Sequence, residues 1–255
     1  MISISWLTLL LPLTFVSAFP LWHRGNTFCD QWGSVSTGPY TLANDLWNKD
    51  SATSGWQCTT LESINGNRVK WFTDWSWTGA PSQVKSFANV QLNEGIHQQL
   101  SAITSMPSTW HWSHSGNESV SCDVAFDLFT SYSPDGNDSN EVMIWMANFN
   151  AGPISYNYGS DGKSVPIATD IPIAGHTWDL HLGWNGVNTV WSFIPTKGVI
   201  RAFKGDIYGF LTYLTGNGHI SSSEYLVTAQ AGTEAMTGTS TFKTSAYELS
   251  INLAD

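Results

Sequence analysis

Short runs of β-branched and aromatic residues recur along this chain, and each run is bounded by Gly, Asn, Asp, Ser or Pro. Spacing of this kind is typical of antiparallel strands joined by turns, as in a β-sandwich or a barrel. Six runs fit the pattern, at residues 69–77, 120–129, 141–147, 189–194, 225–231 and 247–253. One helix is expected at 206–214, where apolar side chains fall on one face at helical spacing. The sequence therefore predicts an all-β fold of two layers with one short helix.

The first eighteen residues, MISISWLTLLLPLTFVSA, form an apolar block that ends in a small-residue cleavage pattern. This is typical of a secretory signal peptide, so we expect residues 1–18 to be removed and the mature protein to be secreted outside the cell. A membrane anchor is the alternative, because the block lacks a basic residue. No second apolar span follows, so we expect no contact with a membrane. Residues 19–28 are then a short N-terminal extension, and 29–255 form a single domain because no linker or repeat divides them.

The composition restricts the classes of function. Only 12% of the 255 residues are charged, the net charge is −10, and there are 14 Trp. An acidic chain repels phosphate groups, which argues against nucleic acid as a partner. Tryptophan at this density must fill a large core or line a binding surface, and we expect some of it to line a surface. The protein is predicted to be a monomer that needs no cofactor.

The run 140–147 holds one acidic side chain in an otherwise apolar stretch. In a strand, Glu141, Met143, Trp145 and Ala147 point to one face, and the residues between them point to the other. The second set is ordinary core. The first set combines a carboxylate with a thioether and an indole, which fits a concave sugar-binding face. An edge strand with a solvated glutamate is the alternative.

The run 120–129 also carries acids on its non-core face, where Asp123 and Asp127 alternate with Ala125 and Phe129. If this strand lies beside the previous one, Asp127 comes close to Glu141. Adjacent carboxylates raise one pKa and can share a proton, which is a useful arrangement for tuning a nucleophile.

A third acid, Glu234, lies in the stretch AGTEAMTG at 231–238, and Gln230 shares its side of the strand. Two glycines and a threonine beside a lone glutamate suggest a turn where a substrate passes close to the backbone.

Flat indole rings at strand spacing could form a platform for sugars, whose C–H faces are apolar. The candidates are Trp47 and the set Trp71, Trp75 and Trp77, which shares one strand face. The alternative is that these side chains belong to the core, which we expect for at least half of them.

Three cysteines favour one disulfide and one leftover thiol in an oxidising compartment. A bridge between Cys29 and Cys58 would close a strand-turn-strand segment and stabilise the fold by about 3–4 kcal/mol. Cys122 lies on the apolar face of its strand and is predicted to be a buried inert thiol, with a catalytic nucleophile as the alternative. Sequons at Asn117 and Asn137 in turn-rich segments predict N-glycosylation.

Ten short motifs stand in a fixed order: CDQW at 29–32, NDLW at 44–47, DWSW at 74–77, VKSF at 84–87, VAFDLFT at 124–130, EVMIW at 141–145, AGPI at 151–154, WNG at 184–186, GD at 205–206 and AGTEAMTG at 231–238. In this order they resemble glycoside hydrolase family 12, the small secreted endoglucanases and xyloglucanases. The resemblance runs from about residue 29 to residue 253. It implies a β-jelly-roll sandwich of two antiparallel sheets with a substrate cleft on the concave face. It also implies hydrolysis of internal β-1,4-glucosidic bonds with retention of configuration.

The functional positions of the family carry over onto residues of this chain. The resemblance implies that Glu141 is the nucleophile, Glu234 the general acid/base and Asp127 the aspartate that supports the nucleophile. Cys29 and Cys58 match the family disulfide. The resemblance and the strand faces together predict six substrate-binding residues: Trp47, Met143, Trp145, Pro153, Asn185 and Gln230.

The main prediction is an endo-β-1,4-glucanase acting on soluble or amorphous cellulose and mixed-linkage glucan. A xyloglucan-specific enzyme is the alternative, because the stretches 167–175 and 231–234 look like that branch. A non-catalytic glucan-binding jelly roll would use the same aromatic residues but would need no carboxylate pair. A metal enzyme would have to use His111 and His114, which point to opposite faces of a strand, so no metal site is expected. The chain departs from the family pattern at Asn140, where an aromatic residue often precedes the nucleophile.

Overall fold

The computed structural model describes residues 26–116 and 119–254. The predicted signal peptide and the sequon at Asn117 lie outside the described residues, as does the predicted extension apart from residues 26–28. In the described part of the chain, no helix is long and apolar enough to span a membrane.

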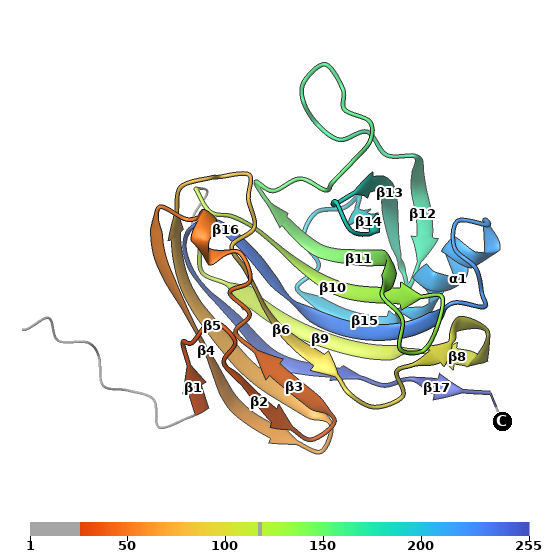
Figure 1. The fold of residues 1–255 in the computed structure, drawn as a ribbon, viewed down its shortest axis with the longest axis horizontal. Coiled ribbons are helices and arrows are strands. Elements are labelled where there is room, and N and C mark those ends of the chain that lie inside the picture. The colour runs from red at the N-terminus through yellow and green to blue at the C-terminus, as the bar shows by residue number, and fades with distance from the viewer. Residues whose placement is uncertain (1–25, 117–118, 255) are drawn as a thin grey trace, which may run out of the picture.

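Two β-sheets pack against each other, and their strands are long and curved (Figure 1). The back sheet has the order β1-β4-β5-β16-β9-β15, with β1 (Asn26–Phe28), β4 (Ser54–Asn65), β5 (Arg68–Thr78), β9 (Pro107–His114), β15 (Ala202–Asp206) and β16 (Tyr225–Leu249). The front sheet has the order β2-β3-β6-β16-β10-β11-β14-β13-β12, with β2 (Ser34–Thr37), β3 (Tyr40–Ala43), β6 (Ser86–Leu92), β10 (Ser121–Ser131), β11 (Asp138–Phe149), β12 (Ala168–Ile173), β13 (His176–Trp184) and β14 (Thr189–Pro195). Short pieces complete the described chain: β7 (Gln98–Gln99), β8 (Ile103–Ser105), β17 (Asn252–Leu253), two 3-10 turns at Lys49–Ser51 and Leu100–Ala102, and helix α1 (Tyr208–Gly216).

The predicted architecture is confirmed, with one departure in strand direction. Five of the six predicted strands lie in β5, β10, β11, β14 and the first part of β16, and the predicted helix is displaced by two residues from α1. The N–H of Tyr208 donates to Oδ1 of Asp206 at 2.9 Å, which starts the helix, and Phe210, Leu211 and Leu214 bury its inner face. The strand pairs of the described residues are antiparallel except β11 and β14, which run parallel.

Strand β16 belongs to both sheets. Its first half pairs with β6 and β10 as far as Thr237, and its second half pairs with β5 from Gly238 onward. Gly238 has a φ of 109°, which a residue with a side chain rarely adopts, so glycine permits the change of direction between sheets. The predicted turn around Glu234 is therefore wrong. Gly232 is close to the backbone of β6 and not to a substrate, since an added Cβ would lie 2.1 Å from the carbonyl oxygen of Ala88.

The end of β16 also differs from the prediction for residues 247–253. Residues 247–249 belong to β16, and the chain leaves that strand before the two-residue strand β17 pairs with β8. The break removes this segment from the back sheet, so one continuous terminal strand does not form.

The main core fills the space between the two sheets. The front sheet contributes Val124, Phe126, Val142, Ile144, Trp178 and Phe193, and the back sheet contributes Trp71, Trp110, Phe203, Phe242 and Tyr247. Trp75 and Trp77 lie in a second buried cluster with Leu46 and Cys122. The expectation that at least half of the candidate tryptophans belong to the core is confirmed, and Trp71, Trp75 and Trp77 form no sugar platform, because this face of β5 points between the sheets.

Strand alternation also fails at one position of β11. Trp145 pairs with Ala125 and Ala147 pairs with Val124, so Met146 is an extra residue in the ladder. A bulge of this kind turns the following side chain to the other face. Ala147 accordingly packs in the main core and not beside Glu141.

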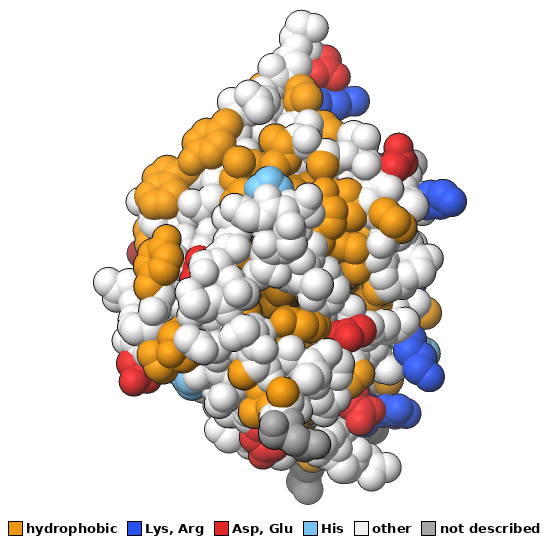
Figure 2. Space-filling view, turned by 90° about the vertical axis from the view of Figure 1, so that its right-hand side faces the viewer, with side chains coloured by type: hydrophobic (Ala, Val, Ile, Leu, Met, Phe, Trp, Pro, Cys, Tyr) orange, Lys and Arg blue, Asp and Glu red, His pale blue; other side chains and the backbone are white. Residues whose placement is uncertain are grey.

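Charged side chains are scattered over the face that carries α1, and Lys and Arg form no cluster there (Figure 2). The ion pairs of the described residues are Arg68–Glu248 and Lys243–Glu62 on the back sheet. Exposed pairs of this kind contribute little stability, so the fold depends on its core and its strand hydrogen bonds.

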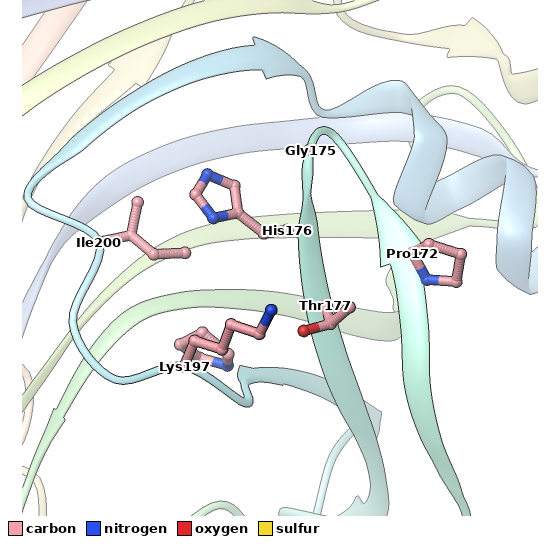
Figure 3. Close-up of a pocket in the computed structure, with 7 residues that line it drawn as sticks. Pro172, Gly175, His176, Thr177, Lys197 and Ile200 are labelled. Carbon is pink, nitrogen blue, oxygen red and sulfur yellow. The ribbon is translucent and has the colours of Figure 1, made fainter.

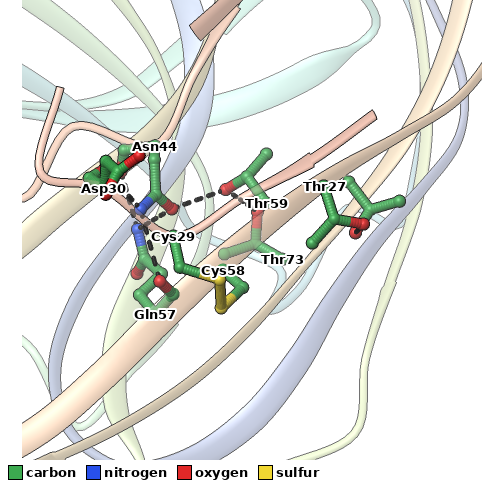
Figure 4. Close-up of a disulfide and its surroundings, with 9 residues drawn as sticks. Thr27, Cys29, Asp30, Asn44, Gln57, Cys58, Thr59 and Thr73 are labelled. Atoms are coloured by element: carbon green, nitrogen blue, oxygen red, sulfur yellow. Dashed lines mark hydrogen bonds between the residues drawn. A yellow bond between two sulfur atoms is a disulfide. The ribbon is translucent and has the colours of Figure 1, made fainter. Parts of the chain in front are cut away.

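A disulfide joins Cys29 to Cys58, as predicted (Figure 4). Cys122 is free and buried. Replacing Cys29 and Cys58 by Ser should lower the free energy of unfolding by about 3–4 kcal/mol, because the unfolded chain loses a cross-link. Urea unfolding measures the change. Cys122→Ala, which removes a thiol but no cross-link, is the control. A loss within about 1 kcal/mol of that control would mean that the bridge contributes little.

A buried polar network beside the disulfide holds the segment 44–47 against the back sheet (Figure 4). Asn44 is fully buried, and its Oδ1 accepts a hydrogen bond from Oγ1 of Thr59 at 2.9 Å. Gln57 Nε2 donates to the carbonyl of Asn44 at 2.7 Å. Because buried polar groups are costly without partners, this pairing fixes the backbone where Asp45 and Trp47 follow.

Candidate active site

A cleft of about 690 Å³ crosses the front sheet. Its floor comes from β6, β10, β11 and β16, and its walls come from the segments 45–47, 82–84, 152–154 and 184–188. This volume lies within the range of ligand-binding sites, about 300–1,000 Å³, so the cleft can hold part of a sugar chain.

Three of the predicted site residues meet on the cleft floor. Glu141 in β11 pairs with Phe129 of β10, and Asp127 in β10 pairs with Gln230 of β16, the strand that carries Glu234. Asp127 therefore lies on the strand between the two glutamates. Burial and then the negative charge of Glu234 raise the pKa of Glu141, and both glutamates raise the pKa of Asp127. The three carboxyl groups are thus within electrostatic reach of one another.

Glu141 is mostly buried and has one strong neutral partner. Its Oε2 accepts a hydrogen bond from Nδ2 of Asn185 at 2.6 Å, which favours the charged form. The Oδ1 of Asn185 accepts the N–H groups of Val187 at 2.8 Å and Asn188 at 2.7 Å. These bonds close the turn between β13 and β14 around Asn185 and hold its amide toward Glu141.

Among the described residues, no hydrogen-bond donor like Asn185 reaches the carboxyl group of Glu234, and acids lie beside it. Burial raises its pKa well above the usual range, and the negative charges of Asp123 and Asp45 raise it further. Two glutamates with such different neighbours have different proton affinities. We expect Glu141 to ionise first and Glu234 to keep its proton to higher pH.

Asp127 is buried beside Glu141, and burial raises its pKa well above the usual range. Its Oδ1 has no hydrogen-bond partner among the described residues. A protonated Asp127 can donate to the carboxylate of Glu141, which is the shared-proton arrangement that the strand pattern predicted.

Most of the predicted binding residues line the cleft. Trp47 is 51% exposed at one wall, Met143 and Trp145 lie buried in the floor, and Asn185 and Gln230 complete the set. Pro153 is the exception, since it is buried and its neighbours Gly152 and Ile154 line the cleft in its place.

Sequence reasoning assigned no role to several residues that line the cleft, Trp184 and Asp45 among them. Trp184 is 48% exposed at the wall opposite Trp47, and its signal was the WNG motif. Asp45, in the NDLW motif, lines the cleft with a φ of 43°, and burial raises its pKa to about 6. Asp123 was placed on the correct face but received no role.

A buried network supports the backbone just before Glu141. Asn140 Nδ2 donates to Oε2 of Glu224 at 2.9 Å, and Asn140 Oδ1 accepts from Nε1 of Trp191 at 3.0 Å. Thr130 Oγ1 also donates to Glu224 Oε2, at 2.6 Å. At Asn140, where the chain departs from the family pattern, these hydrogen bonds fix β11.

A second pocket, of about 380 Å³, lies between the β12–β13 turn and the segment that follows β14 (Figure 3). His176 and Lys197 are its titratable residues, and it contains no carboxylate. Among the described residues, no group of three or more His, Cys, Asp or Glu side chains could hold a metal ion. His114 stacks on Phe149, and His111 is exposed.

Asn137 and Cys122, the remaining residues with a predicted role, have different surroundings. Asn137 is exposed in the turn between β10 and β11, so its side chain is accessible for N-glycosylation. Burial raises the pKa of the Cys122 thiol far above its usual range, which keeps the thiol protonated and inert.

Comparisons with known proteins show which enzymes this chain is similar to. The model described as Glycosyl hydrolase family 12 matches residues 38–252. A probable xyloglucan-specific endo-beta-1,4-glucanase A of Neosartorya fischeri is 47% identical over 226 residues, which cover 88% of this chain and 91% of the relative. The xyloglucan-specific endo-beta-1,4-glucanase A of Aspergillus niger is 43% identical over 242 residues, which cover 94% of this chain and 96% of the relative.

Solved structures give the same answer for the fold. The catalytic domain of Humicola grisea Cel12A, in complex with a thio cellotetraose, has a TM-score of 0.82 at 35% identity and covers 89% of this chain and 99% of that domain. Endoglucanase 3 of Trichoderma harzianum has a TM-score of 0.80 at 34% identity, with 90% and 98% covered. The predicted jelly roll is confirmed. The chain belongs to glycosyl hydrolase family 12 and is a retaining glycoside hydrolase, as its motifs predicted.

Proposed function

We propose that this protein cuts internal β-1,4-glucosidic bonds of xyloglucan, with Glu141 as nucleophile and Glu234 as general acid/base. The observation that carries the proposal is the pair of glutamates in one cleft, the first beside a neutral donor and the second beside acids. A retaining mechanism needs one carboxylate that is charged and one that is protonated, about 5–5.5 Å apart.

In the first step, the Glu141 carboxylate attacks C1 of the sugar and the C1–O bond breaks. The electron pair of that bond goes to the leaving oxygen, which takes the proton of Glu234. Asp127 lies buried beside Glu141 and tunes its charge, and Asn185 keeps the carboxylate in position through the bond at 2.6 Å. The product is a glycosyl ester of Glu141 and a free leaving sugar.

In the second step, the ionised Glu234 takes a proton from water, and the water oxygen forms a bond to C1. The ester bond to Glu141 breaks, so Glu141 is a carboxylate again and Glu234 is protonated again. Two displacements at C1 restore the original β configuration.

Sugar rings bind across the floor between Trp47 and Trp184, the exposed tryptophans that line this cleft. Trp47 and Trp184 are each about half exposed at facing walls, so their rings can stack on sugars without first being uncovered. Met143, Trp145 and Gln230 contact the sugar chain from the floor of the cleft. Pro153 is buried and acts by shaping the backbone of 152–154.

Xyloglucan is the proposed substrate because two relatives, 47% and 43% identical to this chain, carry that activity in their names. This was the alternative in the sequence analysis, and β-1,4-glucan without side chains remains the second candidate because the solved structure of Cel12A holds a thio cellotetraose. We further propose a secreted monomer that carries a glycan at Asn137.

The test compares kcat/KM on xyloglucan, carboxymethylcellulose and mixed-linkage glucan, with the anomer followed by NMR as it forms. We expect a preference for xyloglucan of roughly tenfold or more and release of the β anomer first. If carboxymethylcellulose is hydrolysed faster than xyloglucan, the proposed substrate is wrong. If the α anomer is released first, the proposed retaining mechanism is wrong. No release of reducing sugar from any of the three would leave only a glucan-binding role.

A further inference from the structure

Trp56 is an exposed tryptophan that lies outside the cleft. It belongs to β4 of the back sheet, and 51% of its surface is exposed, the same fraction as for Trp47 at the cleft wall. Core tryptophans such as Trp71 and Trp110 pack against other rings, whereas no ring contact of the described residues involves Trp56. Single apolar side chains are common on protein surfaces, so the surroundings of Trp56 decide whether it has a function.

A pocket of about 340 Å³ opens beside Trp56, and the segment 46–52 lines it together with β4. Lys49, Asp50 and Ser54 line it with polar groups. In the described part of the chain, neither Lys49 nor Asp50 has an ion pair or a side-chain hydrogen bond, so both charged groups are available to the hydroxyls of a ligand. The volume lies within the range of ligand-binding sites.

The buried part of this pocket is fixed before any ligand binds. Gln57 is fully paired, since its Nε2 donates to the carbonyl of Asn44 at 2.7 Å and its Oε1 accepts from Oγ of Ser86 at 2.7 Å. Nε1 of the buried Trp77 donates to the same hydroxyl at 3.2 Å. Cys29 is held by its disulfide, which lies beside Gln57 (Figure 4). A preformed site of this kind loses little conformational entropy when it binds a ligand.

Neutral hydroxyl groups continue the surface from Trp56 across the back sheet. Ser76 is the cross-strand partner of Trp56, and its Oγ lies 2.8 Å from Oγ1 of Thr239 in β16. Ser54 and Thr78 form a second hydroxyl pair at 2.8 Å in the next row of the sheet. Alternation along β4 and β5 places these hydroxyls on the same side as Trp56, the side that points away from the core.

This combination fits a neutral polysaccharide better than a protein or a membrane. A sugar ring has an apolar C–H face that can lie on an indole, and its hydroxyls bond to hydroxyl, ammonium and carboxylate groups. A stable protein interface buries about 800 Å² on each partner around a centre of low charge, whereas Lys49 and Asp50 lie beside the ring here. An anionic membrane attracts clusters of Lys and Arg, and this pocket contains a single Lys.

The segment 45–50 contributes to both sites. Asp45 and Trp47 line the cleft, while Leu46 and Lys49 line the pocket beside Trp56. We propose that Trp56 and this pocket form a second, non-catalytic site that binds a β-1,4-glucan chain and holds the polymer close to the cleft. The choice of ligand rests on the proposed function, because the glucan that the cleft hydrolyses surrounds the enzyme where it acts. A polymer bound here presents its other segments to the cleft at a high local concentration.

Trp56→Ala should raise the KM of polymeric xyloglucan by roughly fivefold or more and leave kcat within about twofold, because an anchor of the polymer is lost and the catalytic residues are untouched. On a xyloglucan oligosaccharide no longer than the cleft, both constants should stay within about twofold of the wild type, since such a ligand occupies the cleft alone. If polymer and oligosaccharide respond alike to Trp56→Ala, the inference is wrong.

Tyr132→Ala is the matched control for this variant. Tyr132 is also an aromatic residue on the surface, 78% exposed, but it lines neither the cleft nor the pocket beside Trp56. Its kcat and KM on the polymer should equal those of the wild type. A rise in KM as large as that of Trp56→Ala would show that any exposed aromatic residue has this effect, and no specific site would remain.

A second measurement does not depend on activity. Native electrophoresis in gels that contain xyloglucan compares Glu141→Gln with the double variant that also carries Trp56→Ala, so the polymer is not degraded during the run. The second substitution should lower the association constant by roughly fivefold. Equal retardation of the two proteins would overturn the inference.

Light scattering tests the other occupant of this face, a second copy of the chain. We expect the same monomer mass for the wild type and for Trp56→Ala. A wild-type dimer that Trp56→Ala dissociates would show that Trp56 binds protein, and the inference would be wrong. A wild type that hydrolyses no glucan, but whose retardation depends on Trp56, would contradict the proposed function alone.

Discussion

Glu141→Gln should hydrolyse xyloglucan roughly 10⁴-fold more slowly than the wild type, or slower still, while it keeps its affinity for the polymer. The amide has the shape of the carboxylate, so the cleft and the contact with Asn185 survive. It carries no negative charge, so it cannot attack C1. Reducing-sugar release measures the rate, and calorimetry with a xyloglucan oligosaccharide measures the affinity.

Glu94→Gln is the control for this prediction, since Glu94 is exposed after β6 and lies outside the cleft. A sharper readout comes from Glu141→Ala with added azide. Azide can enter the space of the missing carboxylate and attack from the same side, which yields an α-glycosyl azide. A Glu141→Gln enzyme that keeps more than about 1% of the wild-type rate would exclude Glu141 as the nucleophile.

Glu234→Gln should lower kcat/KM on xyloglucan by roughly 10²–10⁴-fold, because the leaving oxygen departs without a proton. The basic limb of the pH profile should disappear with it, since Glu234 is the group whose proton is lost on that limb. An aryl glycoside with a 2,4-dinitrophenolate leaving group should react almost as fast as with the wild type in the glycosylation step. The contrast between the two substrates separates loss of the acid from damage to the fold.

The product formed with azide distinguishes the two glutamates. In Glu234→Ala, azide should attack the glycosyl ester of Glu141 from the face that water normally uses, which yields a β-glycosyl azide. An α-glycosyl azide from this variant would contradict the assignment, because it would place Glu234 on the side of the nucleophile.

Local patterns in the chain predicted much of the fold. Alternation along 141–147 separated Val142 and Ile144, which are core, from Glu141 and Met143, which line the cleft. The prediction from alternation was wrong at Ala147, because a bulge adds one unpaired residue to the strand and turns the next side chain to the other face.

The tryptophans of β5 show a second limit of local patterns. A face of Trp71, Trp75 and Trp77 looks the same in sequence whether it covers a core or a sugar. Whether this face is core or binds sugar depends on the sheet that lies opposite it. Here the face lies between the two sheets and is buried. The exposure of Trp184 in the cleft was not predicted, because it depends on the turn around Asn185 at the end of the strand.

The sequence motifs were enough to identify the family, the jelly roll, the disulfide and the two glutamates as candidates, because each is a short pattern or a residue type in a known order. The surroundings of those glutamates came from the tertiary structure alone. Asp123 and Glu234 are 111 residues apart in the chain, and Asn185 is 44 residues from Glu141. Proton affinity depends on charges and donors within a few ångströms, and such neighbours exist only after the strands have paired.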